Sequence, residues 1–476
     1  MKPLLLLLTV FAQVGYAQAT LLWHQPTRGV AIATDSADHV YTVDWDQNPA
    51  GDIDLTKHDA LGTFLWRVTY DNTNATRHEA ATWVETDNDD NILVSGTIRS
   101  GFSSPVNANA LLMKFDSSGT LLWRRVFESD FDGSSTRKCL VDSNNNIYVL
   151  GLGAGPSGIV TKVKKFSPDG DALWSYFNAA GIGAGQNFKF TPDYHLVIWG
   201  RSSAGSFNGY AKIDLDGNEV WSLAGIGSSS SGDIAGDSSG NTYIINGQYV
   251  QGATGGILTK LNTAGAAIWS VTNSINATKV EVGSDQHPVI GGFPNSGGFG
   301  VAFMKYDTSG NVLWLNPDAD GPGYNLLTHA IMKLDVANNA YLAAGTLFEM
   351  AVCRVNADGT SAWVAHSSGA NAADFDFGKD CSLYVVGGGI TRFTQPPPDV
   401  SCTRTTLGGE PGAISIALPS AEGGLYLLEH SENLSSWSPR SEIRITLPGV
   451  LEFTDNEPAT SGKFYRIVKK DEGITP

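Results

Sequence analysis

Charged residues are scarce in this chain: they make up 17% of its 476 residues, with 31 Lys and Arg against 48 Asp and Glu. The resulting net charge of −17 excludes a protein that follows a nucleic-acid backbone, because such proteins present clustered positive charge to the phosphates. After the first residues, no apolar run approaches the roughly 18 residues that a membrane-spanning helix needs. We therefore expect neither a nucleic-acid partner nor a transmembrane segment.

Cysteine is also scarce, with 4 residues at wide spacings. None forms a Cys-x-x-Cys pair, so the sequence offers no zinc ribbon and no dithiol redox motif. In an oxidising compartment these cysteines allow up to two disulfides in three pairings, and burial without pairing is the simpler expectation. The four are Cys139, Cys353, Cys381 and Cys402.

Glycine is abundant, with 54 residues, and it stands with Ser, Asn, Asp and Thr between short apolar runs. This composition is typical of short β-strands joined by tight turns, and it argues against a helical bundle. The 42% hydrophobic content is too high for a disordered chain.

The first 19 residues have the organisation of a secretory signal peptide. Lys2 provides a positive start, an apolar run follows from Leu4 to Phe11, and Ala17-Gln18-Ala19 fits the small-x-small cleavage pattern. We therefore expect residues 1–19 to be removed and the protein to be secreted, periplasmic or on the cell surface.

A repeat of about 48 residues organises most of the chain. Its clearest unit is a strand beginning with Lys or Arg, a turn with Gly, and a Trp nine residues after the first position, as in KFSPDGDALW at 165–174. Successive Trp spacings are 57, 51, 47, 48, 45 and 49 residues. The seven complete copies end at Trp66, Trp123, Trp174, Trp221, Trp269, Trp314 and Trp363.

A second unit precedes each Trp unit and consists of an Asp-rich turn followed by a strand ending near Gly, as in DSNNNIYVLG at 142–151. Together the two units give four short antiparallel strands per repeat, which is a propeller blade rather than a solenoid coil. After Trp363 only three strands remain, while LLWHQ at 21–25 carries an orphan, Trp23. We therefore predict an all-β, eight-bladed β-propeller over residues 20–395, in which the N-terminal strand completes the last blade.

The eight repeat tryptophans, Trp23 and the seven above, are interpreted as structural residues. Each is expected to wedge between blades and bury about 150–250 Å². Loss of one indole would cost about 3–5 kcal/mol.

The alternation of DxxGNxYxxG with KxDxxGxxxW resembles the secreted bacterial β-propeller repeat (SBBP-like) family and is similar to quinoprotein-type propellers with Trp-anchored blades. The resemblance covers residues 20–395 and implies the fold, but fold alone does not specify function. Quinoproteins use adjacent cysteines over the cofactor, and this chain has no Cys-Cys pair. We therefore expect no quinone, and no other cofactor.

Beyond the repeats, a Pro-rich linker at 396–405 leads to a small β-sandwich-like domain at 406–470 and a tail at 471–476. The run LYLLEHSENLSSWSP at 425–439, with LEFTD and KFYRI after it, resembles a module that ends many long secreted bacterial proteins. Its role is an open question, with attachment or accessory binding as hypotheses.

The sequence contains no catalytic constellation. GDSSG at 236–240 matches a nucleophile pattern, but Ser238 stands in an Asp-rich turn rather than a strand-to-helix elbow. Two turns resemble the start of a calcium loop, yet Ile98 and Gly225 stand where such loops place a Glu, so we expect turns without metal and keep calcium as an alternative. The two turns contain Asp87, Asp89 and Asn91, and Asp214, Asp216 and Asn218.

Loops between the second and third strands of the blades are the candidate binding site. They gather on one rim, vary in length and place aromatic side chains beside polar ones. Exposed indoles there could stack on a sugar or anchor a protein, although these aromatics could equally cover the blade ends. The candidate residues are Asp44, Trp45, Arg99, Phe102, Trp199, Arg201, Phe207, Tyr249, Phe293 and Phe348.

Three functions are consistent with the sequence. The preferred hypothesis is a secreted, non-catalytic, monomeric scaffold that binds a glycan or an extracellular protein through this rim. The second is an extracellular lyase or hydrolase with carboxylates in the central channel, which sequence proximity would not reveal. The third is an adhesive surface protein tethered by the C-terminal domain.

Overall fold

A computed structural model gives the arrangement of most of the chain. The N-terminal residues 1–18 (all but the last of the expected signal peptide), the linker and the tail lie outside the described residues. The described residues are 19–45, 51–71, 77–100, 108–127, 136–155, 158–178, 182–202, 207–226, 231–247, 256–294, 300–320, 328–335, 337–346, 349–368, 372–378, 382–394, 414–421, 424–431, 438–445, 449–455 and 464–470.

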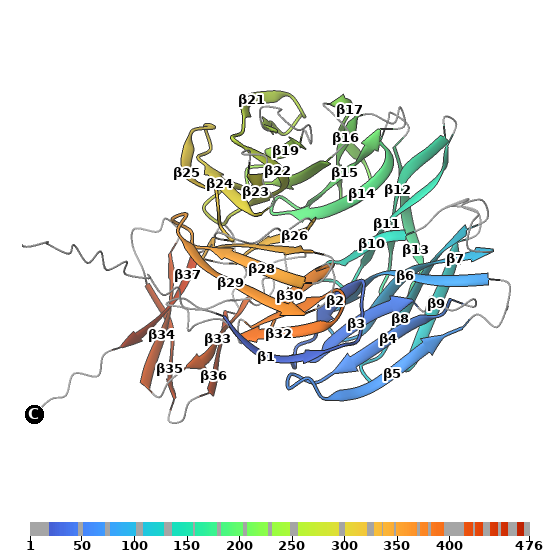
Figure 1. Cartoon of the computed structure of the whole chain (residues 1–476), viewed down its shortest axis with the longest axis horizontal. Coiled ribbons are helices and arrows are strands. Elements are labelled where there is room, and N and C mark those ends of the chain that lie inside the picture. Colours follow the sequence, from blue (N-terminus) through green and yellow to red (C-terminus); the bar gives the residue numbers. More distant parts are fainter. Residues whose placement is uncertain are drawn as a thin grey trace, which may run out of the picture.

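Eight four-stranded antiparallel sheets form a ring, so the predicted eight-bladed propeller is confirmed (Figure 1). Every described element is a strand, and the part of the chain that is described has no helix long and apolar enough to cross a membrane. Within each blade the strands follow one another from the channel outward.

The first four blades are each one continuous stretch of chain. Blade 1 contains β2 (Ala31–Thr34), β3 (Val40–Trp45), β4 (Ile53–His58) and β5 (Phe64–Tyr70). Blade 2 contains β6 (Arg77–Thr86), β7 (Ile92–Ser100), β8 (Ala108–Phe115) and β9 (Leu121–Phe127). Blade 3 contains β10 (Thr136–Val141), β11 (Ile147–Gly155), β12 (Gly158–Phe166) and β13 (Ala172–Phe177). Blade 4 contains β14 (Ile182–Thr191), β15 (His195–Ser202), β16 (Asn208–Asp214) and β17 (Glu219–Ile226).

The next three blades repeat this arrangement. Blade 5 contains β18 (Ser231–Gly236), β19 (Thr242–Gly247), β20 (Ile257–Leu261) and β21 (Ala267–Thr272). Blade 6 contains β22 (Ile275–Val282), β23 (Pro288–Pro294), β24 (Ala302–Tyr306) and β25 (Val312–Asn316). Blade 7 contains β26 (Thr328–Leu334), β27 (Ala340–Gly345), β28 (Glu349–Val355) and β29 (Ser361–Ser368).

Blade 8 is built from both ends of the propeller sequence. Its inner three strands are β30 (Asp374–Phe377), β31 (Leu383–Val386) and β32 (Ile390–Thr394), and its outer strand is β1 (Thr20–Gln25). β1 pairs antiparallel with β32, placing Trp23 opposite Arg392. In Figure 1 the dark blue β1 accordingly lies beside the orange β32. The ring is closed without a covalent bond.

The Asp-rich turns between the first two strands of a blade organise their own backbone. The Asp142 carboxylate accepts from the backbone N–H of Asn144 and of Asn146, both at 2.9 Å, and from the Asn146 amide at 2.9 Å. The buried Tyr148 hydroxyl donates to the same carboxylate at 3.0 Å. Asp thus closes the turn as an Asx motif and anchors the strand that follows. The same Asp–Tyr pair recurs as Asp35–Tyr41, Asp237–Tyr243 and Asp335–Tyr341.

The repeat tryptophans pack on the glycines of the next blade. A Cβ added to Gly62 would lie 2.5 Å from Cδ2 of Trp23, so only glycine admits the indole there. Trp23 also donates its indole N–H to the carbonyl of Ala60 at 3.0 Å, while Trp363 is buried beside blade 8. The other pairs in this arrangement are Trp66–Gly119, Trp123–Gly170, Trp174–Gly217, Trp221–Gly265, Trp269–Gly310 and Trp314–Gly359.

Two of the four cysteines belong to the described residues. Cys139 and Cys353 are fully buried and form no disulfide, and burial raises the pKa of both thiols. Such thiols are unreactive packing groups. Cys381 and Cys402 lie outside the described residues.

After the propeller, the chain forms strands in two smaller sheets. One pairs β33 with β36, and the other has the order β35-β34-β37. These strands agree with the expectation of an all-β C-terminal region. Their bounds are β33 (Ile414–Ala421), β34 (Gly424–Ser431), β35 (Ser438–Ile445), β36 (Gly449–Asp455) and β37 (Phe464–Lys470).

Candidate functional site

The expected rim residues fall where the second and third strands of a blade meet, but they differ in exposure. Arg201 is exposed near the end of β15. Asp44 is partly buried on β3, opposite Asp54 on β4. Phe293 is partly buried on β23. Of these three residues, Arg201 is the exposed one.

Trp199 agrees with the second of the two expectations for the rim aromatics, which is packing on the blades rather than an exposed platform. Its side chain is partly buried and packs on the apolar cluster between blades 4 and 5. The indole nitrogen is buried, with no hydrogen-bond partner among the described residues, and it lies close enough to Gly232 on β18 to exclude a Cβ there. Trp199 therefore packs at the junction of blades 4 and 5 and does not form an exposed platform.

Several other candidates cannot be placed as side chains. Trp45 and Arg99 belong to β3 and β7 as backbone, and their side chains lie outside the described residues. Phe102, Tyr249 and Phe348 lie wholly outside them.

One exposed pair lies on the hairpin between β15 and β16. Phe207, immediately before β16, exposes 43% of its surface. Arg201 pairs as backbone with Asn208, the residue that follows Phe207. An exposed aromatic ring and an exposed guanidinium thus stand on adjacent strand ends, which is a combination that recognition surfaces favour.

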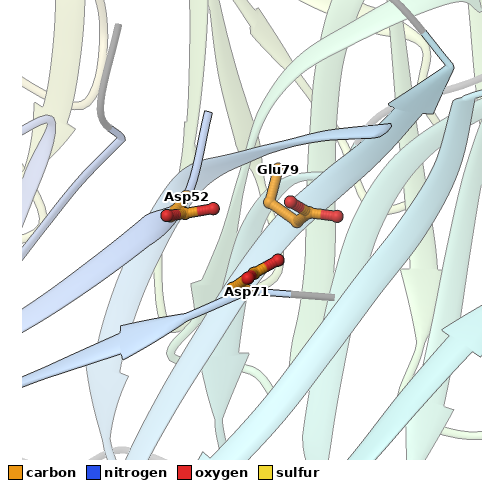
Figure 2. Close-up of side chains that lie close together, drawn as sticks. All are labelled: Asp52, Asp71 and Glu79. Atoms are coloured by element: carbon orange, nitrogen blue, oxygen red, sulfur yellow. The ribbon is translucent and has the colours of Figure 1, made fainter. Parts of the chain in front are cut away.

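A group of carboxylates stands where blade 1 leads into blade 2 (Figure 2). One carboxylate oxygen from each of Asp52, Asp71 and Glu79 lies within 4.8 Å of the other two. Asp52 precedes β4, Asp71 follows β5 and Glu79 lies on β6, where it is only 2% exposed. Oxygen ligands of this kind suit calcium better than a transition metal. Sequence reasoning missed the group because its members come from three separate segments.

In the two turns that resemble calcium loops, the first Asp accepts hydrogen bonds from the backbone of its own turn. The Asp87 carboxylate accepts from the backbone N–H of Asp89 and Asn91 and forms an ion pair with Lys114 at 2.8 Å. Asp214 accepts from the backbone N–H of Asp216 at 3.0 Å and of Asn218 at 2.8 Å. Both carboxylates therefore bind backbone N–H groups, as in the other Asp turns, and Asp87 also binds the Lys114 ammonium.

The inner strands carry a network of opposite charges, contributed by successive blades. Lys189 on β14 contacts the carboxylates of Asp233 on β18 at 2.9 Å and Glu281 on β22 at 2.8 Å. Lys189 also donates to the Val280 carbonyl at 2.9 Å, and the Val280 N–H donates to Asp233 at 3.0 Å. One ammonium therefore ties three blades together around the centre of the ring.

The same ring of inner strands continues on either side of Lys189. Lys138 on β10 donates to the Asn187 side chain at 3.2 Å, and Lys333 on β26 pairs with Asp376 on β30 at 3.0 Å. On the far side of blade 8, Asp374 accepts from the backbone N–H of Ile32 on β2 at 3.3 Å. No sequence motif announces this network, since each blade contributes only one or two members.

Burial shifts the titration of these groups. Desolvation raises the pKa of Asp374 to about 6, although Lys333 opposes the shift. Desolvation, with Lys189 nearby, lowers the pKa of Lys138 to about 8. Burial lowers the pKa of Lys279 as well, and that ammonium forms no ion pair within 4 Å in the described part of the chain. Perturbed groups of this kind occur both at active sites and in structural ion networks.

Two carboxylates close enough for a channel hydrolase, Asp233 and Glu281, are bridged by one lysine. Asp233 and Glu281 both contact Lys189, so their oxygens lie at most about 5.7 Å apart, the sum of 2.9 and 2.8 Å. The Lys189 ammonium contacts both carboxylates. The arrangement therefore favours a structural role for this pair.

Comparisons with known proteins support the fold and no finer assignment. No family model matches the chain, and no curated protein matches it. Among solved structures, the Dos1 propeller matches with a TM-score of 0.52 at 10% identity, covering 79% of this chain and 95% of that one. The WD40 β-propeller domain of Doa1 matches with a TM-score of 0.45 at 9% identity, covering 80% and 97%. At 10% identity, the likeness to the Dos1 propeller bears only on the architecture of this chain, which is a β-propeller.

Proposed function

We propose that this protein is a secreted, non-catalytic binding module that holds a glycan or an extracellular protein against the rim where β15 ends. The observation that carries the proposal is the exposed Phe207–Arg201 pair on the β15–β16 hairpin. A closed ring of eight blades is a rigid support, and exposed aromatic and guanidinium groups on such a support contribute most of the binding energy in many interfaces.

The neutralised channel argues for binding rather than hydrolysis. Hydrolytic carboxylates need one group held protonated and both within reach of substrate. Asp233 and Glu281 instead share one lysine. The leader sequence supports export, and we propose that the rim meets its ligand outside the cytoplasm.

The test compares two ends of the same strand. A glycan array and an extracellular-protein pull-down are run with the mature protein, with the double variant Phe207→Ala/Arg201→Ala, and with Tyr194→Ala. Tyr194 is 55% exposed in the turn between β14 and β15, at the opposite end of β15. We expect a binder that the double variant loses by tenfold or more, about 1.4 kcal/mol, and that Tyr194→Ala retains. No binder in either screen, or equal loss in both variants, contradicts the proposal.

A further inference from the structure

Blade 8 is the one blade of the described ring whose strands do not follow one another along the chain. Blades 1 to 7 are continuous stretches, whereas β1 is joined to β32 only by strand pairing and packing. On its other side β1 meets blade 1 through Trp23 on Gly62. We call this set of contacts the seam. Release of β1 would open the outer edge of blade 8, while the contacts of β30 with β2 remain.

Two histidines lie inside the seam. The first is His24, the neighbour of Trp23 on β1. Its Nδ1 lies 2.8 Å from the Thr391 hydroxyl of β32 and 3.1 Å from the Ser367 hydroxyl of β29. Its ring also lies against Gly389, where a Cβ would come within 2.4 Å of the imidazole. Hydroxyl groups and backbone surround this imidazole.

The second is His58, at the end of β4 beneath the indole of Trp23. It is 2% exposed, and its ring centroid lies 6.5 Å from that of Trp23 at an interplanar angle of 28°. Phe64 on β5 covers another side at 5.9 Å, and the Nδ1 atom has no hydrogen-bond partner in the described residues. A charged His58 imidazole would be poorly solvated in this buried position.

The charged groups near the seam do not compensate such a charge. Asp59, next to His58 in sequence, is the one anion that favours its protonated form, and burial outweighs it. The guanidinium of Arg392, which donates to the Ala60 carbonyl at 2.5 Å, adds a positive charge on the β32 side. Burial accordingly lowers the pKa of both His24 and His58.

The inner edge of the same junction responds to acid in the opposite sense. Asp374 and Asp376 on β30 accept from the backbone N–H groups of Ile32 and Thr34 on β2. The pKa of Asp374 is raised to about 6, so the folded state favours its protonated form and acid does not weaken this edge through that group. Lys333, paired with Asp376, is the adjacent cation.

We propose that the seam is an acid-sensitive latch, in which protonation of His24 and His58 releases β1 from blade 8 while β30 stays against β2. A histidine that the folded state holds neutral contributes its full stability above its ordinary pKa of about 6.5 and loses it as pH falls. β1 is the element that carries both contacts, so it leaves first. Mild acid therefore opens the outer edge of the ring without dissolving the blades.

Hydrogen exchange at pH 7.5 and pH 5.0, corrected for the intrinsic rate, measures the latch directly. In the wild-type protein we expect the opening constant of β1 amides to rise by roughly threefold or more at pH 5.0, relative to the β11–β12 amides. The double variant His24→Gln/His58→Phe should show no such rise. His287→Gln is the matched control, because His287 lies in blade 6 beside Asp285, away from the seam.

Three results would overturn the latch: no acid-induced opening of β1 in the wild type, the same opening in the double variant, or its loss in His287→Gln. Should the double variant fail to fold, His24→Gln alone must reduce the rise. An NMR titration of the wild-type imidazoles gives an independent check, because both must titrate below the ordinary histidine range in the folded state. Titration at or above that range contradicts the inference.

Discussion

Trp23 and Arg392 donate to the same carbonyl, that of Ala60, at 3.0 and 2.5 Å, although one residue begins the propeller and the other ends it. In blade 3 the same junction is formed by a lysine and a tryptophan, because Lys165 of the third strand and Trp174 of the fourth both donate to the Leu215 carbonyl. Blades 2 and 5 have the same pair of bonds. Blade 8 reproduces that junction from two ends of the sequence. Closure is therefore one more copy of the repeat.

Loss of the channel lysine that joins three blades is expected to be costly. Lys189→Met leaves the buried Asp233 and the partly buried Glu281 without their cation, and because removal of one partner of a fully buried ion pair costs about 3–5 kcal/mol, we expect a loss of about 2–4 kcal/mol. Lys279→Met is the matched control, since it removes an ammonium that forms no ion pair within 4 Å in the described residues and whose charged form burial disfavours. Urea unfolding should rank Lys279→Met at or near wild type. Equal losses would contradict the network.

Asp374 should contribute to the pH dependence of the free energy of unfolding. Because its folded pKa of about 6 lies above the unfolded value of about 3.9, the folded state binds the extra proton between those values. This group alone therefore makes stability fall as pH rises from 4 to 7, by up to about 3 kcal/mol. Asp374→Asn should flatten that part of the profile in denaturant titrations across this range.

Asp35 should contribute a pH dependence of stability opposite in sign to that of Asp374. Burial opposes ionisation of Asp35, but hydrogen bonds from the His39 backbone, Tyr41 and others outweigh it and hold the pKa below its ordinary value. Its contribution is present above the unfolded pKa and is lost as pH falls through the folded pKa. A profile in which Asp35→Asn and Asp374→Asn change the same limb in the same direction would contradict this assignment.

The Asp turns should prove structural. Asp142→Ala removes the acceptor of two backbone N–H groups, the Asn146 amide and the Tyr148 hydroxyl, and a loss of about 1–3 kcal/mol is expected. Asp169→Ala, at an exposed position in the outer turn of the same blade, should stay within about 0.5 kcal/mol of wild type. The free energy of unfolding in urea measures both, and similar values for the two would contradict the account.

The architecture can be predicted from the sequence because each residue type of the repeat has one structural role. The blades share the same backbone and packing requirements. These are met by a Gly at the turn, a Trp nine residues after Lys and an Asp before Asn. Even the split blade follows, because Trp23 lacks a blade of its own and the three propeller strands after Trp363, at 374–394, lack a tryptophan.

The candidate site is less accessible to sequence reasoning. The sequence leaves open whether Trp199 is exposed or packs on the blades, because no local pattern distinguishes an indole that packs on Gly232 from one that faces solvent. The charges of the inner strands and the carboxylates of Figure 2 come together only through the ring. Residues that one blade supplies singly, such as Lys189, leave no periodic signal.

Thermal and urea unfolding of Gly62→Ala beside Gly225→Ala tests the closure of the ring most directly. Both glycines adopt left-handed backbone, with φ of +82° and +74°, so both substitutions carry the same strain of about 1–2 kcal/mol. Only at Gly62 would the new Cβ meet the indole of Trp23, at 2.5 Å, whereas nothing lies within 4 Å at Gly225. We expect Gly62→Ala to lose a further 1–3 kcal/mol, roughly the cost of overpacking. Equal stability of the two variants would show that Trp23 does not close the propeller.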